Sequence, residues 1–248
     1  LAQYAGLPEA VRNMRLNGDW VKPDGAVFQL DREHKLRELP EHYSKTEWEH
    51  FFGIDPAYRG YTGYAMIARD PLNGNLWSVF SGYLEGQAPS DLVVKAEKIM
   101  AGYNITKRIY DSHETAFWKE AAKVKIFYQG VYKKTSRKAE LIRQLQEHIE
   151  MKPYYIVAKK NIDYLREIEG AQWSDTAEGK IKNSTKYHIL DSVQYILDKI
   201  PKWNPKNAPP KKESYTEMLT RKHFEELEAK DRKAKRKQRI KRTRRRRR

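Results

Sequence analysis

The 248-residue sequence has no cysteine, which excludes disulfide bonds and thiolate metal sites. It has no secretory signal peptide and no apolar run near the ~18 residues that a membrane span requires. The phosphate-binding pattern G-x-x-x-x-G-K-[ST] is absent, so we expect no ATP hydrolysis by a P-loop. Because the chain begins with Leu1 and not with methionine, we expect it to be a fragment or a processed product.

Positive charge is concentrated at one end of the chain. Residues 230–248 contain 14 lysines and arginines against one acid, Asp231, and contribute +13 of the formal net charge of +16. Such a segment cannot bury its charge, so we expect it to be disordered on its own and to bind polyanions in a salt-dependent way. Contact with nucleic acid or a partner protein is the favoured interpretation. The alternative is a tail that only solubilises or localises the protein.

The pattern of apolar residues and turns predicts a mixed α/β fold. Residues 51–55, 62–69 and 76–84 are apolar segments joined by short turns, which indicates an antiparallel meander of three strands. Helical and strand patterns alternate after it, which is typical of parallel strands with helices between them. We expect helices at 92–102, 114–122, 136–151, 162–168 and 184–200, and strands at 105–111, 124–128 and 154–158.

Composition divides the chain into three parts. Residues 1–46 are charged and weakly periodic, and we interpret them as a connecting segment. Residues 47–203 carry the patterned region and form the main domain. Prolines between residues 201 and 210 end it, so residues 204–248 are expected to be a linker and the basic tail, with an exposed helix at 216–229.

Two of the predicted strands end on an acid, Asp55 and Asp111. Hydrolysis of a phosphodiester requires neutralised phosphate charge and a deprotonated water, which paired Mg²⁺ or Mn²⁺ ions supply. These hard ions prefer carboxylate oxygens. Acids at the ends of adjacent strands are therefore candidate ligands of a catalytic metal centre. The alternative is that each acid only forms a turn or caps a helix.

The last predicted helix carries a histidine and an acid three residues apart. Its apolar residues fall on one face, and His188 and Asp191 lie together on the opposite, polar face. Asp191 is the third candidate metal ligand. A histidine beside it can bind metal, transfer a proton or orient water. The alternative is a solvated helix face.

Other charged residues are less favoured as members of the predicted metal site. We expect Asp70 to form a turn, Glu114 to cap a helix or support the metal, Glu167 to lie on the surface and Asp198 to point to solvent. The candidates for DNA contact are basic residues at predicted turns, with an ordinary charged surface as the alternative: Arg59, Lys133, Lys134, Arg137 and Lys138.

Three motifs occur in a characteristic order. They are FGIDP at residues 52–56, before a glycine-rich hairpin, RIYD at 108–111 and YHILD at 187–191. Together they resemble the nuclease domain of the large terminase subunit of tailed phages. The NGDW at residues 17–20 is similar to the stretch that joins the ATPase and nuclease domains in that family. The resemblance covers about residues 10–200.

The resemblance implies an RNase H-like domain that cuts concatemeric double-stranded viral DNA during genome packaging in the host cytoplasm. It implies two Mg²⁺ or Mn²⁺ ions held by Asp55, Asp111 and Asp191, with His188 matching a histidine of some members. Many relatives have further acids just before the last aspartate, where this chain has residues 184–187 (STKY), which leaves the ligands of the second ion open. The ATPase half, the portal protein and the small terminase subunit are the implied partners.

Two alternatives to a packaging endonuclease remain open at this point. Another RNase H-like nuclease, such as a Holliday-junction resolvase or a transposase, would share the acidic site. A non-catalytic module that binds DNA or the portal would use the same acids only structurally, and the basic tail also suits that interpretation. Metal dependence separates the nucleases from the binding module.

Overall fold

A computed structural model describes residues 25–204, except for residues 59, 87, 133–134, 151–152, 175–179 and 183. The chain divides into two compact units, and every described residue lies in the first, Leu1–Ala208. The NGDW stretch at residues 17–20, the expected helix at 216–229 and the basic tail all lie outside the described residues.

A mixed six-stranded sheet forms the centre of the described domain, with the strand order β5-β4-β1-β2-β3-β6. Strands β1, β2 and β3 form the predicted antiparallel meander, whereas β4, β5 and β6 each pair in parallel with a neighbour. The strands are β1 (Glu49–Asp55), β2 (Tyr61–Arg69), β3 (Leu76–Glu85), β4 (Ile105–Asp111), β5 (Gln129–Val131) and β6 (Tyr154–Ile156).

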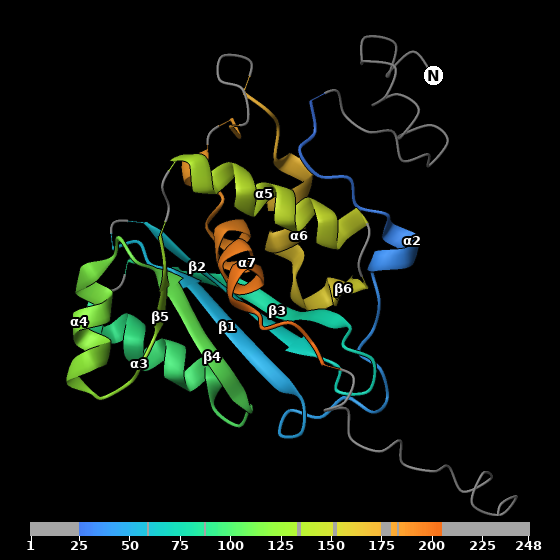
Figure 1. The fold of residues 1–248 in the computed structure, drawn as a ribbon. Coiled ribbons are helices and arrows are strands. Elements are labelled where there is room, and N and C mark those ends of the chain that lie inside the picture. Colours follow the sequence, from blue (N-terminus) through green and yellow to red (C-terminus); the bar gives the residue numbers. More distant parts are fainter. Residues whose placement is uncertain are drawn as a thin grey trace, which may run out of the picture. The chain divides into compact units, whose positions relative to one another are not determined.

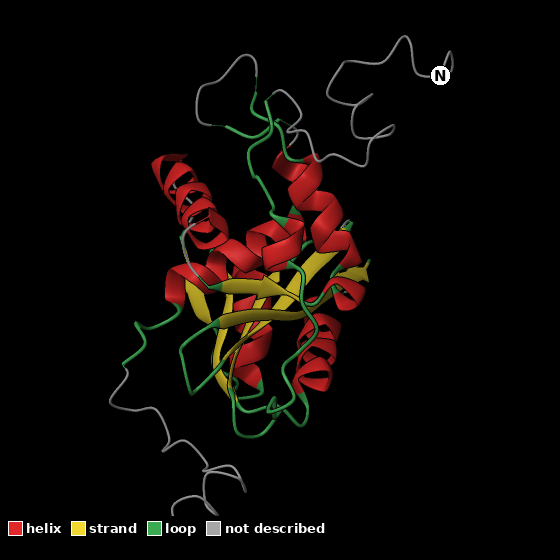
Figure 2. Ribbon diagram, turned by 90° about the vertical axis from the view of Figure 1, so that its right-hand side faces the viewer, coloured by secondary structure: helices red, strands yellow, loops and turns green. Residues whose placement is uncertain are grey.

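Helices cover both faces of this sheet (Figures 1 and 2). Helices α5, α6 and α7 contribute to the core on one face, and α3 and α4 contribute to the core on the other. The described helices are α2 (Arg32–Lys35), α3 (Pro89–Met100), α4 (Thr115–Lys123), α5 (Thr135–Glu150), α6 (Ile162–Gly170) and α7 (His188–Lys199), with short 3₁₀ turns η2 (Ala158–Lys160) and η3 (Ser184–Lys186).

Strand β1 shows why both faces need a helical cover. Successive side chains of a strand point to opposite faces, so Phe51 enters the core beneath α7 and Phe52 enters the core beneath α3 and α4. Both phenylalanines are fully buried. A central strand that is apolar on both sides is typical of a sheet between two helical layers.

Residues 26–30 also contribute to this core, although they belong to the expected connecting segment at 1–46. Val27, Phe28 and Leu30 are buried in the same apolar cluster as α5, α6 and α7. The Val27 amide donates to the Ala171 carbonyl at 3.0 Å, and the Gln146 side chain donates to the Val27 carbonyl at 2.7 Å. This part of the segment therefore packs as a piece of the domain.

Two predicted elements differ from the structure. The fifth strand, expected at 124–128, begins only at Gln129, because pairing with β4 starts there and residues 124–125 form a turn in which Lys125 has a φ of 60°. The last helix, expected over 184–200, is divided into η3 and α7. Among the described residues, no helix combines the length and apolar character needed to cross a membrane.

His50, near the start of β1, is a fully buried titratable group. Its Nδ1 donates to the Trp48 carbonyl at 2.9 Å, because a carbonyl can only accept, and its Nε2 therefore accepts from the Tyr43 hydroxyl at 3.0 Å. Burial lowers the pKa of His50 from 6.5 to about 4. The folded protein thus favours the neutral ring.

Acidification is expected to destabilise the domain through His50. A histidine with a lowered folded pKa contributes stability that is present above pH 6.5 and is lost as the pH falls towards 4. The loss at pH 4.5 amounts to about 2–3 kcal/mol. Urea unfolding at pH 7 and 4.5 should show a smaller pH effect in His50→Gln than in the parent. Equal pH effects in the two proteins would contradict this assignment.

Candidate active site

The two strand-end acids lie side by side in the structure. Strands β1 and β4 are parallel neighbours, and Ile54 pairs with Tyr110, so Asp55 and Asp111 leave the sheet at the same edge. Both aspartates are almost fully buried, with 6% and 7% of their surface exposed. Two buried carboxylates in one place are costly unless hydrogen bonds or cations compensate their charge.

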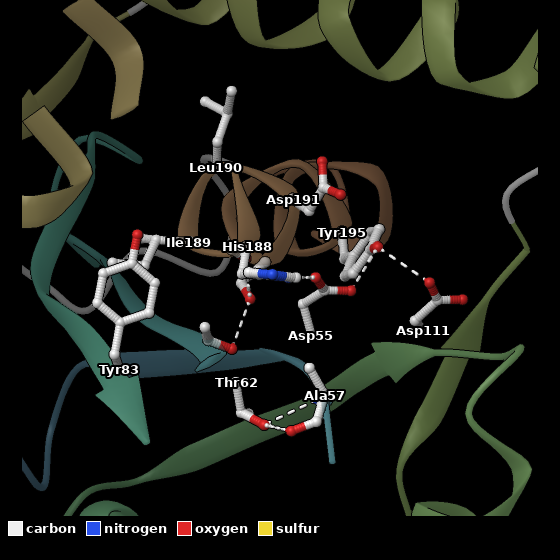
Figure 3. Close-up of polar contacts among 12 residues, drawn as sticks. Asp55, Ala57, Thr62, Tyr83, Asp111, His188, Ile189, Leu190, Asp191 and Tyr195 are labelled. Atoms are coloured by element: carbon white, nitrogen blue, oxygen red, sulfur yellow. Dashed lines mark hydrogen bonds and ion pairs between the residues drawn. The ribbon is translucent and has the colours of Figure 1, made fainter. Parts of the chain in front are cut away.

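A tyrosine of α7 joins these two carboxylates. The Tyr195 hydroxyl lies 3.0 Å from Oδ1 of Asp55 and 3.2 Å from Oδ2 of Asp111, and it donates to both (Figure 3). Burial raises the pKa of Tyr195 well above its ordinary value, and the negative charges of Asp191, Asp55 and Asp111 add to the shift. The hydroxyl therefore keeps its proton and acts as a donor.

His188 is a second partner of Asp55 on α7. Its Nδ1 lies 2.7 Å from Oδ2 of Asp55, so the two oxygens of this carboxylate face two different partners, His188 and Tyr195 (Figure 3). The hydrogen bond to Asp55 raises the pKa of His188, because it favours the protonated ring, and burial opposes the shift. The first turn of α7 thus places a proton carrier next to the acidic pair.

Asp191 takes a different position from the other two acids. Its carboxylate points away from Asp55 in Figure 3. It forms an ion pair with Lys138 of α5, whose ammonium also lies 3.2 Å from Oε1 of Gln194. The structure therefore brings Asp55, Asp111 and His188 together, whereas Asp191 is bound to a lysine.

The expected DNA-contacting residues divide into two groups. Arg137 and Lys138 both face α7, where Arg137 pairs with Asp198 and Lys138 pairs with Asp191. The expectation that Asp198 points to solvent is wrong, because only 2% of its side chain is exposed. Arg59, Lys133 and Lys134 lie outside the described residues.

Glu167 is a site-supporting residue that the sequence analysis placed on the surface. It is buried, and it accepts hydrogen bonds from the backbone amides of Ile189 at 3.3 Å and Leu190 at 2.6 Å and from the Tyr83 hydroxyl. Burial raises the pKa of Glu167 to about 7. Because α7 has no cap from its own N-cap side chain, Glu167 satisfies amide groups at the start of this helix.

Helix α7 packs on the sheet backbone to backbone. A Cβ atom on Gly63 of β2 would lie 2.3 Å from the backbone carbon of His188, and one on Gly53 of β1 would lie 2.5 Å from the Ser192 carbonyl oxygen. The Ser192 hydroxyl donates to the Gly63 carbonyl at 2.9 Å. These glycines allow the close approach that brings Tyr195 to the strand ends.

The acidic pair fits a hard divalent cation in its donor chemistry. Asp55 and Asp111 turn carboxylate oxygens towards one point, the Tyr195 hydroxyl, and such oxygens are the ligands that Mg²⁺ prefers. Within the described part of the chain, no group of three or more His, Asp or Glu side chains is arranged to hold a metal ion. Asp191 does not join the pair in this arrangement.

Glu114 is a further acid near the pair. Burial raises the pKa of Glu114, and the charges of Asp111 and Asp55 contribute to the shift. It is the residue before α4, where it has no side-chain capping bond. The expected capping role is therefore not seen, and proximity to the acidic pair is the feature that distinguishes this residue.

No family model matches the chain, and no curated protein matches it by sequence. Solved structures do match. The large terminase of a thermophilic bacteriophage superposes with a TM-score of 0.61 at 16% identity, over 80% of this chain and 51% of that one. The large terminase nuclease of thermophilic phage G20c superposes with a TM-score of 0.57 at 16% identity, over 71% of this chain and 100% of that one.

The same G20c nuclease with bound magnesium gives a TM-score of 0.56 at 16% identity, over 71% of this chain and 98% of that one. The described domain therefore has an RNase H-like fold, a mixed sheet flanked by helices, as the sequence predicts. More particularly, this fold is that of the nuclease domains of phage large terminases. The chain spans about half the length of the full large terminase that it matches.

Proposed function

We propose that this domain is a metal-dependent endonuclease that cleaves concatemeric double-stranded viral DNA during genome packaging. The observation that carries the proposal is the pair of buried carboxylates, Asp55 and Asp111, joined through Tyr195 at the ends of adjacent parallel strands. The likeness to a terminase nuclease with bound magnesium supports it. The proposed place of action is the host cytoplasm.

Each residue has a proposed part in phosphodiester hydrolysis. Asp55 and Asp111 would hold Mg²⁺ or Mn²⁺, which would neutralise phosphate charge and favour deprotonation of water. His188 is oriented by its 2.7 Å bond to Asp55 and exchanges a proton through its other ring nitrogen. Asp191 would be the candidate ligand of a second ion, whose charge would then take the place of the Lys138 ammonium beside this carboxylate.

The remaining contacts follow from the same proposal. DNA would be held by basic residues near the site and by the tail at 230–248, with the candidates Arg59, Lys133, Lys134, Arg137 and Lys138. Residues 1–46, of which Val27, Phe28 and Leu30 pack in the domain core, would lead from an ATPase half to residues 47–203, the nuclease. The portal protein and the small terminase subunit are the proposed protein partners.

One observation favours a second candidate, a non-catalytic module that binds DNA or the portal. The Lys138–Asp191 ion pair neutralises the third acid from within the chain, as in a purely structural arrangement. In that case Asp55 and Asp111 serve only to anchor Tyr195 and α7.

Removal of metal tests the proposal. Supercoiled plasmid incubated with the protein is expected to be nicked and linearised in Mg²⁺ or Mn²⁺ and to stay intact in EDTA, because the acidic pair needs a cation to act on phosphate. Agarose electrophoresis measures the products, and addition of Mn²⁺ after EDTA should restore cleavage. Cleavage that persists in EDTA contradicts the proposal, and plasmid binding without cleavage in any metal favours the second candidate.

A further inference from the structure

The Tyr195 hydroxyl bonds to two acidic side chains at once. The tyrosine is fully buried, and its one hydroxyl hydrogen is shared between two carboxylates at 3.0 and 3.2 Å. Figure 3 shows its ring reaching from α7 to the point between Asp55 and Asp111. One partner would be enough to satisfy the hydroxyl as a buried donor. Because it bonds to two, it links the carboxylate of Asp55 to that of Asp111.

We propose that Tyr195 is a positioning residue, which holds Asp55 and Asp111 in one orientation so that both offer oxygen to the same divalent cation. The inference rests on the metal site of the proposed function. The proposal gives α7 the part of orienting acids that belong to β1 and β4. Among the described contacts, the donor that bonds to both acids comes from this helix and not from either strand. Tyr195 touches ligands and not the reacting atoms.

The position of the hydroxyl is set by the close packing of α7 on β1. A Cβ on Gly53 would lie 2.5 Å from the Ser192 carbonyl oxygen and 2.7 Å from Cγ1 of Ile196. Ser192 and Ile196 lie before and after Tyr195 in the same turns of α7. The part of the helix that carries the tyrosine therefore lies directly on β1, the strand that ends at Asp55. Helix and strand therefore cannot separate without moving the hydroxyl away from the acids.

Charge explains why a shared donor matters here. Two carboxylates close together in a buried site repel each other, and a common donor compensates both charges. Asp55 also contacts His188. Asp111 also contacts His113, but each of these histidines bonds to only one of the two acids. Without the hydroxyl, the two carboxylates lose their shared partner and can rotate relative to each other, which moves an oxygen away from the cation, because a metal requires ligands in fixed positions. Loss of a partner that orients ligands typically weakens metal affinity by about 10–100-fold.

Mn²⁺ binding to the full chain, measured by isothermal titration calorimetry, tests the proposal without any DNA. Tyr195→Phe keeps the ring and removes the donor, so its Kd is expected to rise by about 10–100-fold. Tyr128→Phe is the matched control. Tyr128 is equally buried on the opposite face of the sheet and loses a 2.9 Å hydroxyl bond to the carboxylate of Glu97. Its Kd should stay within about twofold of the parent.

A donor analogue separates hydrogen bonding from shape. Replacement of Tyr195 by 4-aminophenylalanine restores an N–H donor and should return the Kd to within a few-fold of the parent. A Kd for Tyr195→Phe equal to that of the parent overturns the proposal. Weak Mn²⁺ binding by the 4-aminophenylalanine variant also overturns it, and this measurement decides the matter if Tyr195→Phe does not fold. Asp55→Asn identifies a separate failure: if it binds Mn²⁺ as tightly as the parent, the proposed metal site itself is wrong.

Discussion

Replacement of Asp55 by asparagine is expected to reduce metal-dependent plasmid cleavage by about a thousandfold, equivalent to about 4 kcal/mol of transition-state stabilisation. The substitution keeps the size of the side chain and removes its charge. Asp55 contacts both His188 and Tyr195 and stands at the end of β1, so it is bonded to both of the α7 side chains that reach the acidic pair. Loss of its charge weakens cation binding and removes the partner that orients the histidine.

The measurement is the initial rate of nicking at saturating Mg²⁺, with DNA affinity measured in EDTA by fluorescence anisotropy. DNA affinity should stay unchanged, because a buried carboxylate does not contact the phosphate backbone directly. Asp70→Asn is the matched control: Asp70 is also buried, at 2% exposure, but its carboxylate accepts from the Leu72 amide in the turn between β2 and β3. A rate for Asp55→Asn equal to that of Asp70→Asn would remove Asp55 from the catalytic site.

Substitution of Gly63 by alanine is expected to destabilise the domain by about 3 kcal/mol, because the added Cβ overlaps the helix backbone. It would lie 2.3 Å from the His188 carbon and 2.5 Å from both the His188 oxygen and the Ile189 nitrogen. These are backbone atoms and cannot move aside as a side chain can. The first turn of α7 must shift, and His188 moves with it.

Thermal unfolding followed by circular dichroism provides the measurement, with an expected decrease in Tm of about 10 °C. Gly60→Ala is the control three residues earlier, since a Cβ at Gly60 meets no atom within 4 Å. Its stability should stay within about 0.5 kcal/mol of the parent. Equal Tm values for the two variants would show that α7 does not rest on β2 at Gly63.

The local pattern of the sequence predicted the strands and helices that lie in the centre of the fold. The meander at β1–β3 follows from short apolar segments and from turns such as Asp70–Gly74, which are short-range signals. The fifth strand was misplaced because residues 124–128 are mostly apolar and aromatic, as strand residues often are, yet Val124 and Phe127 are 57% and 78% exposed. Pairing with β4 decides where that strand begins, and pairing is not a local property.

The candidate site shows the same division between local and long-range information. The meeting of Asp55 and Asp111 could be predicted, because parallel neighbours end at one edge of a sheet. Tyr195 was missed, although it lies seven residues after His188 and so shares its face of the helix. A tyrosine on an amphipathic helix is ordinarily part of the core, and only the closeness of the strand ends gives its hydroxyl two acidic partners.

The sequence by itself determined the order of elements and the acids at the strand ends, since these depend on neighbours a few residues away. The tertiary structure alone decided the partners of these groups. Asp191 pairs with Lys138, 53 residues away in the chain, and Glu167 is buried beneath the amides of α7. Whether a charge faces water, a lysine or another carboxylate depends on packing between distant segments, and packing determines which charges are compensated.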